Sequence, residues 1–350
     1  MSMDNDLFAD AARDVLADQC TPQVVRAIEE GGRTAEATTA LWEQLEATGL
    51  ADALLSEDAG GAGLGLGQVF GVLEQCGAHA LPLPLGETMV ARALLAQAGV
   101  ARPAGSIALA RGEHLANGGL RCALVRSGQV AAAVLVQTGT EWRLLNTADA
   151  QGAAQALALD AALTWTAVQV QAAPAVEVNG ALDVRTLQAS VVAAQMAGAL
   201  SSVFQRSLQY ANERQQFGRP IGKFQAIQHQ LAVMSEHVFA ARMAAQLGCS
   251  AGHDGMGVVP DRLRVATAKA RCSEAALVVS ELAHAIHGAI GFTEEYDLQL
   301  FTRRLHAWRQ TAGSEAYWYG VAGEALLHHQ GMTLDIVRRI TDVDAVLGKP

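Results

Sequence analysis

The stretch Glu213-Arg214-Gln215-Gln216-Phe217-Gly218-Arg219-Pro220-Ile221-Gly222-Lys223-Phe224-Gln225 joins two long segments that are rich in alanine and helical in pattern. Gly218 and Pro220 do not sit comfortably inside a helix, so the stretch predicts a corner between two long helices. Arginines, a lysine and two phenylalanines crowd this corner. It can therefore present cations and aromatic faces to an anionic, planar ligand, or it is simply a solvated loop.

This corner resembles the signature of the acyl-CoA dehydrogenase family, in which the Arg and Phe of an E-R-x-x-F-G corner reach across a dimer interface to FAD. A second segment, Ile286-His287-Gly288-Ala289-Ile290-Gly291-Phe292-Thr293-Glu294-Glu295-Tyr296, is similar to the family's h-G-G-x-G-F-T-x-E-Y segment. A third, Ser56-Glu57-Asp58-Ala59-Gly60-Gly61-Ala62-Gly63-Leu64, resembles P-E-x-x-G-G-x-G of its N-terminal helical domain. The resemblance spans most of the chain and implies an FAD-dependent enzyme.

Composition places limits on the class of protein. The chain has 350 residues, enough for one large or two to three modest domains, and 51% of them are hydrophobic, so substantial cores can form. The net charge of -10 argues against a nucleic-acid partner, because no basic excess exists to neutralise phosphates. The five cysteines lack C-x-x-C spacing, which indicates free thiols in a reducing compartment and neither a metal site nor a disulfide framework.

Targeting signals are not evident in the sequence. The first residues, Met1-Ser2-Met3-Asp4-Asn5-Asp6, carry no basic n-region of a signal peptide. No apolar run is expected to be long enough to span a bilayer, which takes roughly 20 residues. We therefore expect a cytoplasmic protein with no membrane partner.

Three segments differ in character along the chain. Residues 4–100 and 181–345 show helical periodicity, whereas residues 104–178 contain short Val and Leu clusters separated by Gly, Thr and Asn. We predict an α+β fold with an N-terminal helical domain (1–103), a small central antiparallel β-domain (104–180) and a C-terminal four-helix bundle (181–345). The family's T-E-P-x-x-G-S-D segment has no counterpart in the central part, which is expected to be a reduced β-domain.

Family members oxidise an acyl-CoA between Cα and Cβ, and the resemblance implies this chemistry here. A glutamate removes the α-proton while the β-hydrogen leaves as hydride to the flavin. Hydrogen-bond donors must hold the thioester oxygen as enolate character develops. The carboxylate needs a desolvated site that raises its basicity.

Both positions where the family places this glutamate lack a carboxylate in this chain. The base normally belongs to an E-G-T segment nine positions after an arginine, and counting from Arg303 leads to Ala312. Other members place the base on the first helix of the bundle, where ungapped alignment from Glu213 puts Gln188. Neither a methyl group nor a neutral amide can take the proton.

Glu315 is the nearby carboxylate that remains as a candidate base. The competing interpretation is a residue at a helix start that interacts with the N-terminal dipole, and we favour it. His284 and His287 lie three residues apart on an apolar helix, so we expect them to be packed or hydrogen-bonded and not catalytic. No carboxylate at metal-ligand spacing accompanies them, so we predict no metal site.

The cofactor positions of the family are partly retained. The resemblance assigns FAD binding to six residues, which are Arg214, Phe217, Gln225, Gly288, Gly291 and Ser314. Arg214 is expected to pair with the pyrophosphate and Phe217 to pack on the adenosine half. A glycine-rich turn permits close approach of the backbone, although Ala289 replaces one family glycine and Ala285 a glutamine.

The sequence as a whole predicts the base-lacking subunit of a hetero-oligomeric, FAD-dependent acyl-CoA dehydrogenase. Some family members consist of two unlike chains and act on bulky CoA thioesters, including steroid side chains. The expected partners are an acyl-CoA, a glutamate-bearing sister subunit in a heterotetramer, and an electron-transfer flavoprotein-type acceptor. Three alternatives remain open: a homo-oligomer, an autonomous enzyme with a relocated base such as Glu315, and a non-catalytic binding or scaffold homologue.

Overall fold

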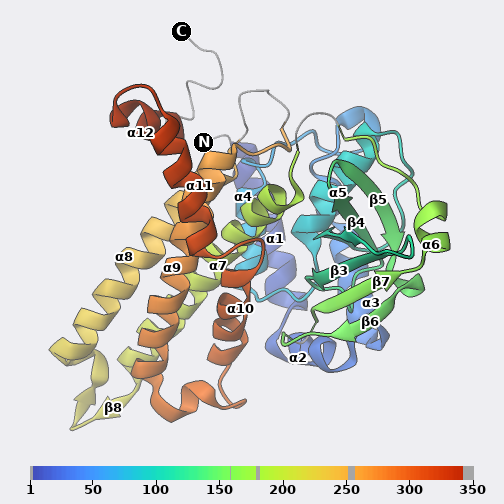
Figure 1. Ribbon diagram of the computed structural model, residues 1–350. Helices are drawn as coiled ribbons and strands as arrows, with labels where there is room; N and C mark the ends of the chain where they lie inside the picture. Colours follow the sequence, from blue (N-terminus) through green and yellow to red (C-terminus); the bar gives the residue numbers. More distant parts are fainter. Residues whose placement is uncertain (1–2, 158, 179–181, 251–256, 342–350) are drawn as a thin grey trace. The chain divides into compact units, whose positions relative to one another are not determined.

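The computed structural model describes residues 3–157, 159–178, 182–250 and 257–341 (Figure 1). The chain forms two compact units, of which unit 1 comprises residues 1–72, 81–191 and 256–259, and unit 2 comprises residues 73–80, 192–255 and 260–350. The expected domain boundary between residues 180 and 181 and the expected end at residue 345 lie outside the described residues. The three-domain division therefore stays a prediction.

Helices dominate both units, and the predicted combination of helical parts with a small sheet region is confirmed. The α-helices are α1 (Met3–Gln19), α2 (Pro22–Gly31), α3 (Glu36–Ala47), α4 (Phe70–Ala78), α5 (Leu85–Gln97), α6 (Ala167–Ala172), α7 (Val184–Glu213), α8 (Gln225–Gly248), α9 (Arg262–His287), α10 (Leu298–Gln310), α11 (Glu315–His328) and α12 (Thr333–Thr341). Short 3-10 helices are η1 (Gly32–Thr34), η2 (Leu50–Asp52), η3 (Glu57–Ala59), η4 (Thr147–Asp149), η5 (Ile221–Lys223) and η6 (Gly288–Phe292).

The local sequence explains where the helices of unit 1 begin and end. Thr21 caps α2 by accepting a hydrogen bond from the Val24 N–H, and Pro22 occupies the first helical position. The apolar stripe of α3 is buried, and the chain turns at Gly49, whose φ of 73° suits a residue without a Cβ.

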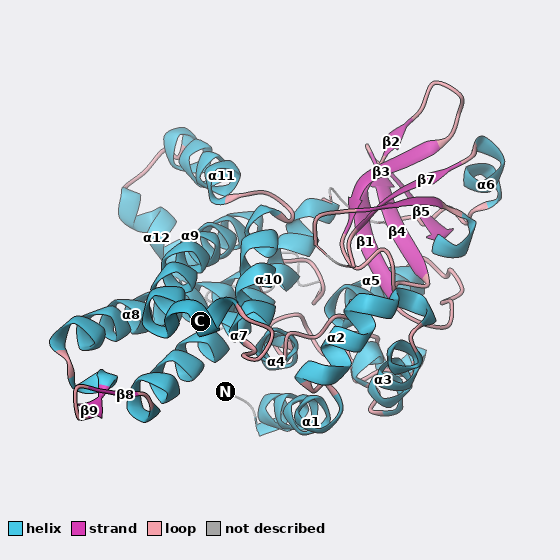
Figure 2. Cartoon of the chain, turned by 90° about the horizontal axis from the view of Figure 1, so that it is seen from below, coloured by secondary structure: helices cyan, strands magenta, loops and turns pink. Residues whose placement is uncertain are grey.

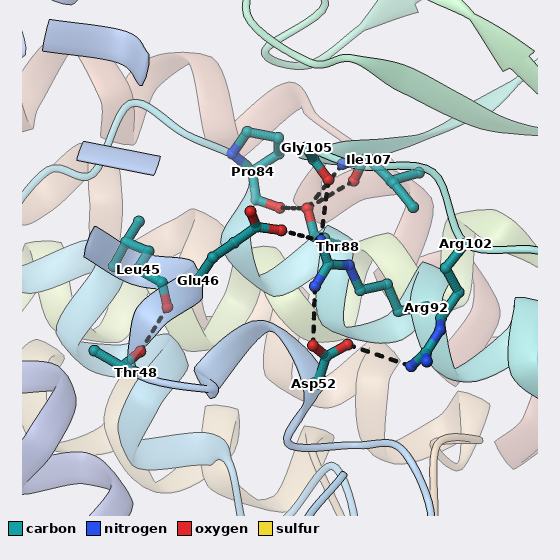
Figure 3. Close-up of polar contacts among 10 residues, drawn as sticks. All are labelled: Leu45, Glu46, Thr48, Asp52, Pro84, Thr88, Arg92, Arg102, Gly105 and Ile107. Atoms are coloured by element: carbon teal, nitrogen blue, oxygen red, sulfur yellow. Dashed lines mark hydrogen bonds and ion pairs between the residues drawn. The ribbon is translucent and has the colours of Figure 1, made fainter. Parts of the chain in front are cut away.

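A buried arginine connects three helical segments of unit 1 to the loop that precedes the first strand (Figure 3). Arg92 on α5 is only 6% exposed and forms ion pairs with Glu46 of α3 and with Asp52 of η2, the latter at 3.1 Å. It also donates to the carbonyl of Gly105 at 3.3 Å. Removing either carboxylate would leave the guanidinium less compensated in a buried place, which is costly.

The strands of unit 1 form two small sheets, drawn in magenta in Figure 2. The strands are β1 (Ile107–Arg111), β2 (Glu113–His114), β3 (Leu120–Val125), β4 (Ala133–Thr138), β5 (Glu141–Asn146), β6 (Gln151–Ala154) and β7 (Ala161–Trp165). One sheet has the order β2-β3-β7-β6 and is antiparallel throughout, and the other has the order β1-β4-β5. In the second sheet β4 and β5 are antiparallel, but β1 and β4 run parallel, because no hairpin joins them.

The long helices of unit 2 form the expected bundle, with α8 and α9 side by side in Figures 1 and 2. Three of them meet at Cys272 of α9, whose thiol lies 3.6 Å from the carbonyl of Ala193 on α7 and 3.5 Å from that of Ala241 on α8. Burial raises the pKa of this thiol to about 12, so it stays protonated. All five cysteines of the chain are free and buried.

The helices α4 and α7 approach each other closely through glycines. A Cβ added to Gly198 would lie 1.8 Å from the carbonyl oxygen of Glu74, and one added to Gly77 would lie 1.7 Å from that of Gln195. The Ser202 hydroxyl donates to the carbonyl of Ala78 at 2.7 Å across the same contact. Backbone meets backbone here, so there is no side chain that can move aside.

A lysine lies in the core of unit 2. The Lys269 ammonium is fully buried and donates to the carbonyls of Arg309 and Gly313, both at 2.9 Å, and to the Ser273 hydroxyl at 3.0 Å. These hydrogen bonds satisfy one backbone carbonyl at the end of α10 and one in the turn that follows. Burial lowers the pKa of Lys269 to about 7, although these acceptors favour the ammonium.

Two helices are long and apolar enough, by length and composition, to cross a membrane, which differs from our expectation. They are α7 and the stretch Arg262–Phe292. The apolar window of α7 is 83% buried within the protein and that of Arg262–Phe292 is 44% buried. Core packing explains the composition of α7.

The glycine contact predicts that Gly198→Ala destabilises the protein by about 3 kcal/mol or more, because overpacking here must displace backbone. The matched control is Gly320→Ala on α11, where an added Cβ meets nothing within 4 Å. This control should gain about 0.5–1 kcal/mol from helix propensity. Urea unfolding followed by circular dichroism measures both changes, and equal stabilities would contradict the contact.

Lys269 predicts a pH-dependent stability. The folded-state pKa of about 7 lies below the ordinary value of 10.5. Between these values the unfolded chain binds more protons, so the free energy of unfolding should rise with pH by up to about 1.4 kcal/mol per pH unit. The rise should be absent in Lys269→Met, which cannot titrate. Parallel stability curves for the two proteins from pH 7 to 10.5 would refute the lowered pKa.

Candidate functional site

The Glu213–Gln225 corner is a tight β-hairpin between α7 and α8. Its strands are β8 (Gln215–Gln216) and β9 (Arg219–Pro220), and its two turn residues, Phe217 and Gly218, have φ values of 51° and 77°. Two positive φ values are typical of the type I′ turn, whose twist matches that of paired strands. Phe217 therefore holds a backbone conformation that is strained for a side-chain-bearing residue, and the residue is 92% exposed.

A pocket of about 500 Å³ lies between this hairpin and the end of α9, wholly within unit 2. Its lining comes from two segments of the chain, namely Tyr210, Arg214, Gln216, Phe217, Ile221, Phe224 and Ile227, and Ala285, Ile286, His287, Gly288 and Ala289. The volume falls in the range of about 300–1,000 Å³ found for small-molecule sites. Both long motifs singled out in the sequence thus contribute to one cavity.

Aromatic rings hold the two segments together. Tyr210 near the end of α7 stacks on His287 at the end of α9, with ring centroids 4.5 Å apart, and Tyr296 lies 5.0 Å from the same imidazole. On the hairpin side, Phe217 meets Phe224 edge to face at 6.2 Å, and the Arg219 guanidinium lies 4.2 Å above the Phe224 ring. The cavity is therefore bordered by flat apolar faces.

Three of the six predicted cofactor residues line the pocket. These are Arg214, Phe217 and Gly288, the last at a φ of 64° where the chain leaves α9. The Arg214 side chain is exposed, and no partner for its guanidinium is seen among the described residues. A free cation at the mouth of an aromatic cavity is suited to an anionic ligand with a planar part.

The other three predicted cofactor residues lie outside the lining. Gln225 is the exposed first residue of α8, and Ser314 precedes α11 without a side-chain cap bond. Gly291 is buried, and an added Cβ would come within 3.1 Å of His284, His287 and Leu298. Gly291 thus lets η6 pack against α9, while the binding roles of all six residues stay predictions.

Ala312, the expected base position, occupies a tight turn after α10. Its φ is 57° and that of Gly313 is 105°, so two successive residues are left-handed. The indole N–H of Trp318 donates to the Ala312 carbonyl at 3.1 Å, and Lys269 binds the carbonyl of Gly313. These hydrogen bonds hold the turn in place, but the side chain of Ala312 is a methyl group, which cannot transfer a proton.

Glu315, the remaining candidate base, is engaged by an arginine. The Arg309 Nε–H donates to one carboxylate oxygen at 2.9 Å, and its Nη2 pairs with the other. Partial burial raises the pKa of Glu315, but the Arg309 hydrogen bonds outweigh it, and the pKa is lowered. A lowered pKa and two occupied oxygens suit an ion pair and are unfavourable for a general base.

Gln188, the alternative base position, lies in a buried polar cluster of unit 1. Its amide donates to the Leu109 carbonyl at 3.0 Å and to Glu87 of α5 at 3.4 Å. Glu87 also accepts a hydrogen bond from the Leu109 N–H at 2.8 Å and lies 3.5 Å from Arg126. Burial raises the pKa of Glu87 despite the Arg126 charge, and this carboxylate is fully inaccessible to solvent.

Sequence reasoning missed two features that the structure brings to these positions. Glu87 contacts Gln188 across 101 residues of sequence, and only its charge within the apolar run Leu85–Leu95 signals a buried role. His287 was expected to pack, and it does, but its place on the pocket is not evident from helical spacing. Among the described residues there is no group of three or more His, Cys, Asp or Glu that could hold a metal.

Comparison with known sequences identifies family domains at both ends of the chain. The domain described as "Acyl-CoA dehydrogenase, N-terminal domain" matches residues 2–102, and "Acyl-CoA dehydrogenase, C-terminal domain" matches residues 186–327. Acyl-CoA dehydrogenase IpdE2 of Mycolicibacterium smegmatis is 30% identical over 318 residues, which cover 89% of this chain and 96% of that protein. Acyl-CoA dehydrogenase FadE34 of Mycobacterium tuberculosis is 30% identical over 310 residues, which cover 83% of this chain and 42% of that protein.

Solved structures share the fold. A variant of the Tcur3481–Tcur3483 steroid ACAD superposes with a TM-score of 0.77 at 28% identity, covering 92% of this chain and 97% of that one. The ChsE4–ChsE5 complex from Mycobacterium tuberculosis gives a TM-score of 0.80 at 21% identity, covering 95% and 99%. Taken with the sequence matches over both ends and the motif-lined pocket, these likenesses show that the chain belongs to the acyl-CoA dehydrogenase family, whose cofactor is FAD.

Proposed function

We propose that this chain is the base-lacking subunit of a hetero-oligomeric acyl-CoA dehydrogenase that oxidises a bulky CoA thioester between Cα and Cβ. The observation that carries the proposal is a contrast within unit 2. The pocket formed by the two cofactor motifs is retained, whereas the base position holds Ala312 and the adjacent Glu315 is bound by Arg309. Such a chain lends cofactor contacts to a site whose glutamate belongs to its neighbour.

The residues of the pocket fit FAD. Arg214 supplies an exposed cation for the pyrophosphate, and the Phe217 and Phe224 rings offer faces for the adenosine half. Gly288 has no Cβ, so its backbone can approach a ligand closely. The imidazole of His287 contributes a buried nitrogen that lacks a partner among the described residues. Bound FAD supplies the hydride acceptor of the reaction.

The division of labour assigns binding to this chain and proton removal to its partner. Arg214 and Phe217 orient the cofactor. The hydrogen bonds from Lys269 and Trp318 hold the Ala312 turn in place, and the side chain of this turn cannot take a proton. The partner's carboxylate takes the α-proton in a desolvated site, where its basicity is raised. An electron-transfer flavoprotein-type acceptor then collects the electrons, and the assembly works in the cytoplasm.

Named two-chain relatives support this arrangement. Two of the similar structures carry paired chain names, Tcur3481–Tcur3483 and ChsE4–ChsE5, and the first is called a steroid ACAD. Another similar structure bears the name of an electron transferring flavoprotein of Acidaminococcus fermentans. By analogy, we assign to this chain a sister subunit and a substrate of the steroid side-chain class.

A relocated base is the second candidate function, and Glu87 is the observation that favours it. This carboxylate has a raised pKa and lies beside Gln188, the alternative base position. Its oxygens, however, already accept from Leu109 and Gln188 and face Arg126, so a substrate would have to displace these partners. An autonomous enzyme would need Glu87 or Glu315 to leave such contacts.

Arg214→Ala is expected to weaken FAD binding by about ten- to a hundredfold, because a charged hydrogen bond to phosphate contributes roughly 1.5–3 kcal/mol. Titration of the deflavinated assembly with FAD, followed by flavin fluorescence, measures this. Arg338→Ala, an exposed arginine on α12, is the control for lost charge and should bind like the wild type. Unchanged affinity in Arg214→Ala would remove the pocket from the cofactor site.

The subunit proposal predicts that the chain purified alone shows little acyl-CoA dehydrogenation. Co-expression with a glutamate-bearing relative should give a yellow, active complex with fewer flavins than subunits. Flavin absorbance per chain and dye reduction by acyl-CoA measure these two properties. A homo-oligomer with one FAD per chain, whose turnover is abolished by Glu315→Gln or Glu87→Gln, would overturn the proposal in favour of a relocated base.

A further inference from the structure

His287 has a nitrogen whose hydrogen bond is missing. Its Nδ1 lies 2.7 Å from the Ala283 carbonyl one turn earlier on α9, and that oxygen can only accept, so Nδ1 carries the proton. The residue is 4% exposed, and Nε2 is buried with no partner among the described residues. A buried acceptor left without a donor is costly, because it has lost its bond to water and gained none in return.

The charge state of the ring makes this nitrogen an acceptor. Burial lowers the pKa of His287, a change that the bond to Ala283 opposes and that the nearby His284 and Arg206 reinforce. The imidazole is therefore neutral at neutral pH, with the lone pair on Nε2. A donor is needed at this atom, and a second acceptor would not satisfy it.

The surroundings of His287 indicate where the donor comes from. The residue lines the pocket together with Tyr210, whose ring stacks on the imidazole, and Arg214 lines the same cavity. Tyr296, which follows η6 in the sequence, also packs against the imidazole but is not among the residues that line the cavity. Within the described protein the donor is absent, so the ligand of this pocket is its natural source.

We propose that His287 Nε2 accepts a hydrogen bond, directly or through one ordered water, from the adenosine half of the bound FAD. That half carries donors of the required kind, namely the 6-amino group of adenine and the ribose hydroxyls. His287 then selects for an adenine dinucleotide, whereas Arg214 recognises any phosphate. This inference rests on the proposed assignment of the pocket to FAD and adds a specificity-determining residue to it.

The test compares His287→Leu, which keeps an apolar side chain but removes the acceptor, with His287→Gln, which restores an acceptor. Losing one neutral hydrogen bond should weaken FAD binding about three- to tenfold in His287→Leu, with recovery in His287→Gln. His306→Leu, at an exposed histidine of α10, is the matched control and should bind like the wild type. Fluorescence titration of the deflavinated assembly gives the affinities without requiring activity.

Apoprotein stability separates a binding role from a structural one. Both His287→Leu and His287→Gln lose the stack on Tyr210, so the two variants are compared with each other: deflavinated His287→Leu should melt no lower than deflavinated His287→Gln, while its FAD affinity is the weaker. A lower melting temperature with unchanged FAD affinity would overturn the proposal and make His287 a packing residue only.

Nucleotide fragments locate the donor on the ligand. ADP should bind the wild type more tightly than at least one of inosine diphosphate, 2′-deoxy-ADP and 3′-deoxy-ADP, and His287→Leu should abolish that preference. Equal binding of all four fragments by the wild type would overturn the inference. If His287→Leu binds FAD normally while Arg214→Ala does not, the pocket assignment stands and only the His287 role fails. If both bind normally, the assignment of the pocket to FAD fails as well.

Discussion

The packing of the end of α7 against the end of α9, where Tyr210 stacks on His287, is the contact on which the pocket depends. The two residues are 77 positions apart, and each lies near the C-terminal end of its helix. Because α8 returns antiparallel between them, the ends of α7 and α9 come to the same end of the bundle, next to the start of α8. Helix length thus determines which side chains meet, and the aromatic contact fixes their distance.

This topology carries an electrostatic consequence. The C-terminal ends of α7 and α9 present partial negative charge, which by itself disfavours a phosphate-containing ligand. Arg214 and the N-terminal end of α8 supply the opposite sign at the same place. The basic corner therefore offsets the partial negative charge of the two helix ends. Its charges have a role beyond keeping a loop solvated.

Carboxylates near both candidate base positions are neutralised by arginines. Arg309 binds Glu315, and Arg126 lies beside Glu87. Pairing of this kind stabilises the ionised form and opposes the desolvation that would raise basicity. Glu87 keeps a raised pKa only because it is fully buried, and full burial also keeps a substrate away. A carboxylate in such an environment cannot be both accessible to a substrate and basic enough to take its proton.

Much of this could be predicted from the sequence, and the limits have physical causes. Gly218 and Pro220 mark the corner because their backbone preferences are local, but the hairpin depends on Phe217 adopting a φ that its sequence disfavours. The sequence itself shows that Ala312 and Gln188 carry no carboxylate. The pairing of β1 with β4 and the contact of Glu87 with Gln188 are long-range, so no local pattern encodes them. An orphaned atom such as His287 Nε2 emerges only when every neighbour is placed.

The left-handed turn at Ala312 has a consequence for substitution at this position. A positive φ penalises any residue with a Cβ, so the alanine already bears the backbone strain that a glutamate would bear. The alanine codons GCA and GCG differ from the glutamate codons GAA and GAG by one base, at the second position. An exchange between alanine and glutamate at this position is therefore a short step in sequence that leaves the backbone of the turn intact.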